Sequence, residues 1–167
     1  MPKLIDVQGS ELANDWTLLD KDCDLATAQT QKGALIVPLA LWLSAAEELQ
    51  ASGHSIGVWL DSDEQPAALA ATLDQLTLVA LHFPKFTDGR AYSSASILRQ
   101  HYKYQGELRA VGEVLRDQLF YMRRCGFTTF DLDDSVKLED ARQALQDFAD
   151  SYQASSEQPL PLFRRRA

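Results

Sequence analysis

The sequence is poor in cysteine. It has two in 167 residues, Cys23 and Cys125, without C-x-x-C spacing and without a histidine or second cysteine nearby. A structural zinc site or an iron–sulfur cluster normally takes four such ligands, so we expect neither. The glycine-rich loops that hold dinucleotides or nucleoside triphosphates are missing, and so is the G-x-S-x-G elbow of hydrolases. These absences predict a protein with no metal site and no bound cofactor.

Long hydrophobic runs and positive charge are scarce as well. No segment reaches the roughly 18 apolar residues of a membrane span, and the first residues, "MPKLIDVQGS", lack the apolar core of a signal peptide. We therefore expect a cytoplasmic protein with no membrane partner. Lysine and arginine total 16 against 24 acidic residues, a formal net charge of −8. This balance argues against nucleic acid as a partner, because phosphate backbones bind clustered positive charge.

The chain does contain a strand–helix rhythm. Apolar runs typical of strands lie at 34–39, 56–60, 76–83, 107–112 and 128–132. The segments between them place apolar residues at helical spacing: Pro66, Leu69, Leu73 and Leu76; Ala91, Ala95, Leu98 and Tyr102; Leu115, Leu119 and Met122; Leu138, Ala141, Leu145, Phe148 and Tyr152. A shorter helix is expected at 44–53, after the strand at 34–39. This alternation favours about four consecutive βα units and a mainly parallel sheet.

The alternation of strands and helices also suggests domain boundaries. We interpret residues 34–153 as one α/β domain and residues 1–33 as a less regular N-terminal segment with a short strand or hairpin around Trp16–Leu19. Residues 154–167, which end in the basic run Arg164–Arg166, are expected to be a flexible C-terminal tail.

Two architectures fit this pattern, an open doubly wound sheet and a half-barrel. A parallel sheet that is covered on both faces has nearly continuous apolar strands, whereas these strands contain His82, Arg109 and Asp131. Because a buried charge needs a partner, one sheet face is expected to open onto a polar cleft or another protein. This clue favours the half-barrel. The alternative is that Arg109 and Asp131 lie near strand ends and reach solvent.

Polar and charged residues are frequent in the segments that connect each strand to the helix after it. Parallel strands bring their carboxyl ends to one edge of a sheet, where α/β proteins usually bind ligands. We therefore predict a site for an anion or a protein partner at this edge, formed by Asp61, Lys85, Asp88, Gly89, Arg90, Arg109 and Glu113. Arg90 and Arg109 are expected to lie close together, with Asp88 orienting one of them.

These residues also have local explanations. Asp88 and Gly89 suit a turn, and the serines that follow suit a helix cap. Arg109 lies in mid-strand, so we expect it to pair with Asp61, Asp88 or Asp131. His82 is expected to be a hydrogen-bonded core histidine rather than a catalytic base. A reactive Cys125 is not favoured, and the pair Asp61 and Asp63 alone is a weak indication of a metal site.

One stretch resembles a known family. The run from Phe83 to Phe127 contains the elements F-P-x-F-x-D-G-R, S-x-A-x-x-L-R, G-x-L-R-A-x-G-x-V, D-Q and R-C-G-F. It is similar to the signature of a bacterial family of unknown function whose members are described as oxidoreductases involved in sulfite reduction. The upstream runs "IVPLALWL" and "IGVWLDSDE" also fit. Thr128 departs from the family pattern, in which an acidic residue commonly follows the phenylalanine.

The resemblance implies a role beside assimilatory sulfite reductase. We expect an accessory protein of sulfite assimilation that binds an oxyanion or a protein partner, with sulfite reductase as the candidate partner. One alternative is an enzyme in which Asp88, Arg90, Arg109 and Glu113 act on a small anionic substrate. Another is a structural interaction subunit that forms a homodimer, or docks on another chain, through an open sheet face. The residues themselves do not support an oxidoreductase, because they include no dinucleotide loop and no cluster ligands.

Overall fold

The structure is a computed structural model that describes residues 3–146. The expected tail at 154–167 and the last helical positions, Phe148 and Tyr152, lie outside the described residues. The strands are β1 (Lys3–Asp6), β2 (Glu11–Leu12), β3 (Trp16–Leu18), β4 (Ala34–Pro38), β5 (Ile56–Leu60), β6 (Leu78–Phe83), β7 (Glu107–Gly112) and β8 (Thr129–Leu132). The α-helices are α1 (Leu25–Thr30), α2 (Leu39–Ala51), α3 (Arg90–Gln100), α4 (Leu119–Cys125) and α5 (Leu138–Gln146). Three short 3-10 helices are η1 (Pro66–Leu69), η2 (Leu73–Gln75) and η3 (Arg116–Gln118).

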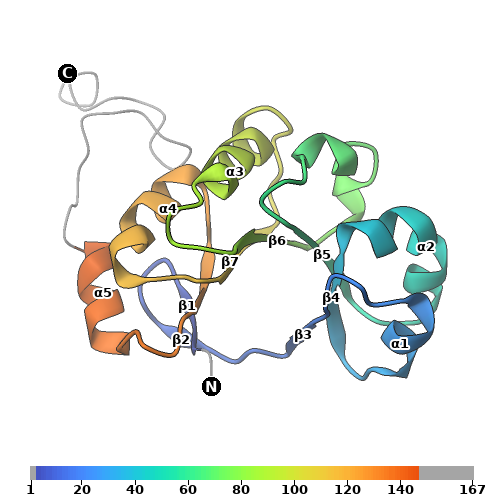
Figure 1. The fold of residues 1–167 in the computed structure, drawn as a ribbon, viewed down its shortest axis with the longest axis horizontal. Helices are drawn as coiled ribbons and strands as arrows, with labels where there is room; N and C mark the ends of the chain where they lie inside the picture. The colour runs from blue at the N-terminus through green and yellow to red at the C-terminus, as the bar shows by residue number, and fades with distance from the viewer. Residues whose placement is uncertain (1–2, 147–167) are drawn as a thin grey trace.

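All strands belong to one curled sheet of eight strands in the order β2-β1-β8-β7-β6-β5-β4-β3. From β3 to β8 every neighbouring pair is parallel and follows the order of the sequence. A doubly wound sheet reverses its strand order, and this one does not. The helices accordingly lie along the outer, convex side of the arc (Figure 1). The structure is therefore the half-barrel of the two predicted architectures.

The sheet is not wholly parallel. β1 pairs antiparallel with both β8 and β2, and β3 pairs parallel with β4, so residues of the N-terminal segment lie at both ends of the sheet. Residues 13–15 connect β2 to β3 and cross from one end of the arc to the other on its concave side (Figure 1). The sequence predicted a strand near β3 but not the strands β1 and β2.

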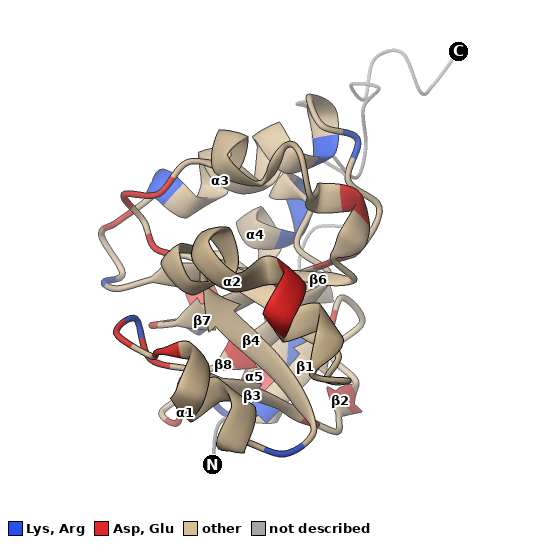
Figure 2. Ribbon diagram, turned by 90° about the vertical axis from the view of Figure 1, so that its right-hand side faces the viewer, with Lys and Arg blue, Asp and Glu red and all other residues tan. Residues whose placement is uncertain are grey.

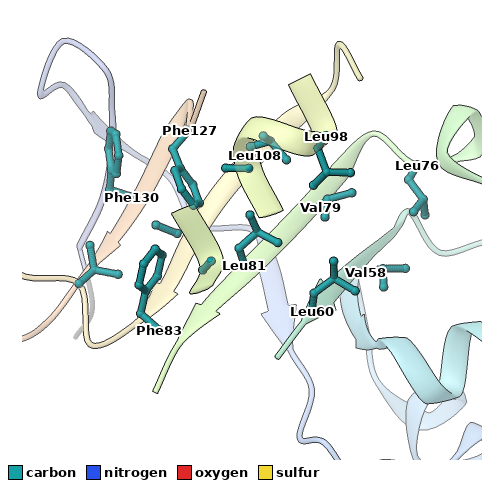
Figure 3. Packing of buried hydrophobic residues seen from close by; sticks show 14 of the residues in the cluster. Val58, Leu60, Leu76, Val79, Leu81, Phe83, Leu98, Leu108, Phe127 and Phe130 are labelled. Carbon is teal, nitrogen blue, oxygen red and sulfur yellow. The ribbon is translucent and has the colours of Figure 1, made fainter. Parts of the chain in front are cut away.

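Side-chain alternation along the strands separates two apolar layers. On the convex side, Val79, Leu81 and Phe83 of β6 pack beneath α3, with Leu98 facing them (Figure 3). On the concave side a second buried cluster contains Ile36, Trp59, Leu78, Ala80 and Val111. These concave residues are at most 7% exposed in a single copy of the chain.

The connection from β5 to β6 differs from the prediction. The expected continuous helix over 66–76 is replaced by η1 and η2, separated at Thr72, whose backbone is not helical. The Thr72 hydroxyl accepts a hydrogen bond of 3.0 Å from Nε1 of Trp42 on α2. The predicted apolar face is nevertheless correct, because Leu69, Leu73 and Leu76 are buried.

Two other helices agree more closely with the sequence pattern. α3 buries Ala91, Ala95 and Leu98, as its spacing predicts, and α4 ends at Gly126 in the left-handed conformation. α2 begins at Leu39, five residues before the expected start, and kinks at Ala45. Among residues 3–146, no helix has both the length and the apolar character needed to cross a membrane.

Candidate functional site

The carboxyl ends of β5 and β6 are joined by a hydrogen-bonded network around Asp61. Lys21, from the loop after β3, donates from Nζ to Oδ2 of Asp61 at 2.6 Å. His82, near the end of β6, lies with Nδ1 3.0 Å from the other oxygen of Asp61. The edge of the His82 ring also contacts Trp59, with ring centroids 5.5 Å apart. Three strands thus contribute to one cluster at the predicted edge.

The ionisation of Asp61 fixes the direction of these hydrogen bonds. Burial opposes its ionisation, but the hydrogen bonds from Lys21 and His82 outweigh burial and hold the pKa of Asp61 at about 2. The carboxylate is therefore ionised at neutral pH and can only accept, so Nδ1 of His82 carries a proton. In the neutral imidazole, Nε2 is then the hydrogen-bond acceptor.

Gly112, at the end of β7, makes room for the His82 ring. Its φ is +96°, and a Cβ atom there would lie 2.4 Å from the carbonyl oxygen of Phe83 and 2.7 Å from Cδ2 of His82. Only a glycine allows both this backbone conformation and this close approach. Gly112 therefore leaves the space that the imidazole of His82 occupies. The sequence did not predict this role.

Asp88 and Arg90 form a second, adjoining cluster after β6. Arg90 donates from Nε and Nη2 to the two oxygens of Asp88, at 3.0 and 2.7 Å, and Nη2 also donates to the hydroxyl of Ser62 at 2.9 Å. The guanidinium holds the pKa of Asp88 well below its usual range. The prediction that Asp88 orients an arginine is thus met by Arg90. Gly89 is the N-cap of α3 and has an ordinary negative φ, and Lys85 is exposed.

Glu113 holds the loop between β6 and α3 through a hydrogen bond with its backbone. Its carboxylate accepts a hydrogen bond from the N–H of Phe86. The carbonyl of Phe86 accepts from Nε2 of Gln118 at 3.4 Å, and Gln118 is buried. Two side chains that follow β7 therefore hold this loop.

Arg109 has different partners from those expected. It is 3% exposed, on the concave side of β7, and its Nη2 lies 2.8 Å from Oε1 of Glu107, to which Nε also donates. Its Nη1 donates to Asn14, in the segment that crosses the concave side, and Glu107 also accepts from the hydroxyl of Thr129. The expected pairing with Asp61, Asp88 or Asp131 is wrong, because Glu107, two residues away, shares the same strand face. A joint role of Arg109 with Arg90 in one site stays a prediction.

Asp131 lies near the hydrogen-bonded group of Arg109, Glu107 and Thr129 but does not take part in its hydrogen bonds. Its Oδ1 atom is buried and has no hydrogen-bond partner among the described residues. Burial raises the pKa of Asp131, although the positive charge of Arg109 acts in the opposite direction. The buried carboxyl group of Asp131 therefore destabilises the folded state locally and does not pair with Arg109.

The strand-end edge as a whole is strongly acidic. The five segments that follow the parallel strands, 19–24, 61–65, 84–90, 113–118 and 133–137, contain eleven carboxylates and five cations. Their formal charge of −6 accounts for most of the −8 of the whole chain. In Figure 2 the loops on the left-hand side of the view, beside α1 and the start of α3, contain several red segments with blue ones between them. We call this surface the acidic edge.

The structure thus connects some of the predicted residues and separates others. Asp61, Asp88 and Arg90 are linked through Ser62, while the contacts of Arg109 lie on the concave face. Sequence reasoning missed Lys21 and Ser62 and placed His82 in the core. Within residues 3–146, no three histidine, cysteine or acidic side chains are arranged to hold a metal ion.

A family model for a bacterial protein of unknown function, DUF934, matches residues 57–163. The chain belongs to the DUF934 family. This match covers β5 to β8 and therefore most of the acidic edge, including Asp61, Asp88 and Arg90. No curated protein matches the sequence significantly. The DUF934 description names no activity, so the functional conclusion depends on the site and on the resemblance described above.

Proposed function

We propose that this DUF934 protein is an accessory protein of assimilatory sulfite reduction whose acidic edge binds a protein partner. The resemblance of Phe83–Phe127 to a family described with sulfite reduction supports the pathway and names sulfite reductase as the candidate partner. The negative charge of the acidic edge supports a positively charged protein as the ligand.

The observation that carries the choice is the pairing of Arg90. An arginine binds an oxyanion best through two parallel hydrogen bonds from its planar fork. Asp88 already accepts two such bonds, from Nε and Nη2 of Arg90. Lys21 is likewise paired with Asp61. With Lys21 and Arg90 paired, and with eleven carboxylates against five cations, the edge disfavours a free oxyanion and favours a positively charged protein surface.

The test is binding of purified sulfite reductase to the full chain, measured at low and physiological salt. Asp63→Lys and Asp117→Lys reverse two exposed charges of the acidic edge, with side chains 64% and 77% exposed. Each is expected to weaken binding about tenfold at low salt, because charges at an interface steer association. Asp74→Lys makes the same change at the opposite edge, before β6, and is expected to leave binding unchanged. No binding by the wild type, or equal losses in all three variants, would contradict the proposal.

The enzyme alternative has one specific observation in its favour. A histidine that is oriented by a carboxylate at the carboxyl ends of half-barrel strands is an arrangement used in general base catalysis. His82 and Asp61 form such a pair, with Nε2 of His82 free of any partner among the described residues. Titration of the protein with sulfite, followed through the NMR signals of the His82 ring, separates the two functions. A saturable change in these signals supports the enzyme, and no change supports the accessory role.

A further inference from the structure

The Phe86 side chain is apolar and exposed to solvent, and hydrogen bonds hold its backbone in place. The residue is 49% exposed, on the connection between β6 and α3. Its N–H donates to Glu113 and its carbonyl accepts from Gln118. Burial of a phenylalanine ring typically stabilises a protein, so a ring that stays exposed gives up that stability. Exposed apolar residues mark a binding surface when several of them lie together.

A second exposed ring belongs to α4. Tyr121 of α4 is 53% exposed, and its ring packs edge-on against Tyr92 of α3 with centroids 4.9 Å apart. Tyr92 in turn contacts Phe83, in the core beneath α3, at 5.1 Å. Tyr121 is thus the outer end of a stack of rings that begins in the core.

Gln118 connects the two exposed rings. Its side chain donates to the carbonyl of Phe86 and forms a hydrogen bond with the hydroxyl of Tyr92, the ring on which Tyr121 rests. Its Oε1 also accepts from the N–H of Leu115 at 3.0 Å. Gln118 is only 5% exposed, and it contacts the backbone of Phe86 directly and Tyr121 only through Tyr92. Rigid aromatic side chains of this kind lose little entropy when a partner binds.

We propose that Phe86 and Tyr121 are the centre of a docking surface for a basic protein segment that carries an apolar side chain. This inference rests on the proposed function and deepens it, because it identifies where on the acidic edge the partner is anchored. Aromatic residues are frequent hot spots at the centre of interfaces, and charged residues at the rim set the choice of partner. Here the neighbouring carboxylates are Glu113, which accepts from the N–H of Phe86, and Asp117, which is 77% exposed and would face the lysines or arginines of the partner.

Charge complementarity selects a basic partner over a second copy of this chain. In a two-fold dimer the same surface meets itself, so each acidic edge would face another acidic edge. With a formal charge of −6 on each edge, that arrangement is repulsive, whereas a basic segment neutralises the charge.

The test is site-specific photo-cross-linking of the full chain in sulfate-limited cells. Benzoylphenylalanine is placed at position 86, at position 121, and as a control at position 43. Leu43 is 58% exposed on α2, outside the five segments that form the acidic edge. Adducts with the same protein from positions 86 and 121, and none from position 43, are expected. The partner is then identified, purified and tested for binding to the wild type, Phe86→Ser and Leu43→Ser.

Phe86→Ser is expected to weaken that binding at least tenfold, with an unchanged melting temperature, while Leu43→Ser has no effect. Adducts with sulfite reductase support both proposals. Adducts with a different basic protein refute the reductase as partner but keep the docking surface. No adduct above the level of position 43, an adduct between two copies, or one with residues 159–166 of the chain itself would overturn the docking inference.

Discussion

The Nδ1 atom of His82 lies 3.0 Å from Oδ1 of Asp61 and joins the carboxyl ends of β5 and β6. Lys21 holds the other oxygen of the same carboxylate at 2.6 Å. Asp61 therefore ties the loop after β3 to two neighbouring strands, and its ionisation is part of the stability of the acidic edge.

This relationship predicts a pH dependence. The pKa of Asp61 is depressed from 3.8 to about 2, so its contribution is present above pH 4 and is lost as the pH falls through 2. Asp61→Asn is expected to lower the free energy of unfolding at pH 7 by about 2 kcal/mol, because it removes the anion that Lys21 and His82 contact. Urea unfolding of both proteins between pH 2 and 7 measures this, and the difference is expected to shrink toward pH 2. A difference independent of pH would show that the charge of Asp61 does not matter.

Arg109 is expected to have a structural role in the concave face. Arg109→Lys keeps the charge but cannot reproduce the contacts of the guanidinium with both Glu107 and Asn14. We expect a loss of about 1–3 kcal/mol in unfolding free energy and a lower melting temperature. Arg90→Lys, at a side chain that is 60% exposed, is the matched control and is expected to cost less stability than Arg109→Lys. Impaired sulfite-dependent growth of Arg109→Lys without any loss of stability would instead place Arg109 in a ligand site.

Gly112 provides a test of close packing around His82. Gly112→Ala introduces a Cβ atom 2.4 Å from a backbone oxygen at a φ of +96°. Gly53→Ala also places alanine at a positive φ, +81°, but meets nothing within 4 Å. Both variants are strained by backbone conformation, about 1 kcal/mol, and only Gly112→Ala adds a steric clash, a further cost of about 1–3 kcal/mol. Equal melting temperatures for the two variants would mean that both the Phe83 carbonyl and the His82 ring move aside at little cost.

Asp131 gives a prediction of the opposite sign. Burial raises its pKa, so the folded state is penalised at neutral pH, where the group is ionised, and is relieved as the pH falls and the proton binds. Asp131→Asn removes the charge. The variant is expected to be more stable relative to wild type at pH 7 than at pH 3, as measured by thermal unfolding at both values. A constant difference across this range would indicate that Asp131 finds a partner in solution.

The sequence predicted features that depend on local spacing. The buried stripe Ala91, Ala95 and Leu98, the stop of α4 at Gly126 and the grouping of Asp61 with Asp88 and Arg90 all follow from periodicity or from parallel strand direction. Each of these signals is contained within a strand or helix or in the loop that follows it.

Features that depend on distant pairing could not be predicted in the same way. β1 and β2 are short, and their place in the sheet is decided by β8, far along the chain. Lys21 reaches Asp61 only because the loop after β3 lies at the same edge as β5, which the sequence of the N-terminal segment does not reveal. The pairing of Arg109 with Glu107 is a local exception: residues two apart in a strand share a face, and the prediction considered only carboxylates from other strands and loops.

The pairing of β1 with β8 has a consequence for the order of events during synthesis. Leu4 lies opposite Asp131, so the first strand to leave the ribosome can complete its ladder only after nearly all of the described chain has been made. At roughly 5–20 residues per second this wait lasts several seconds or more, during which β1 can pair with β2 on one edge only. β4 to β7 need no such delay, since each finds its neighbour in the segment made just before it. We therefore expect the parallel strands to assemble on the ribosome and the amino-terminal strand to close the sheet last.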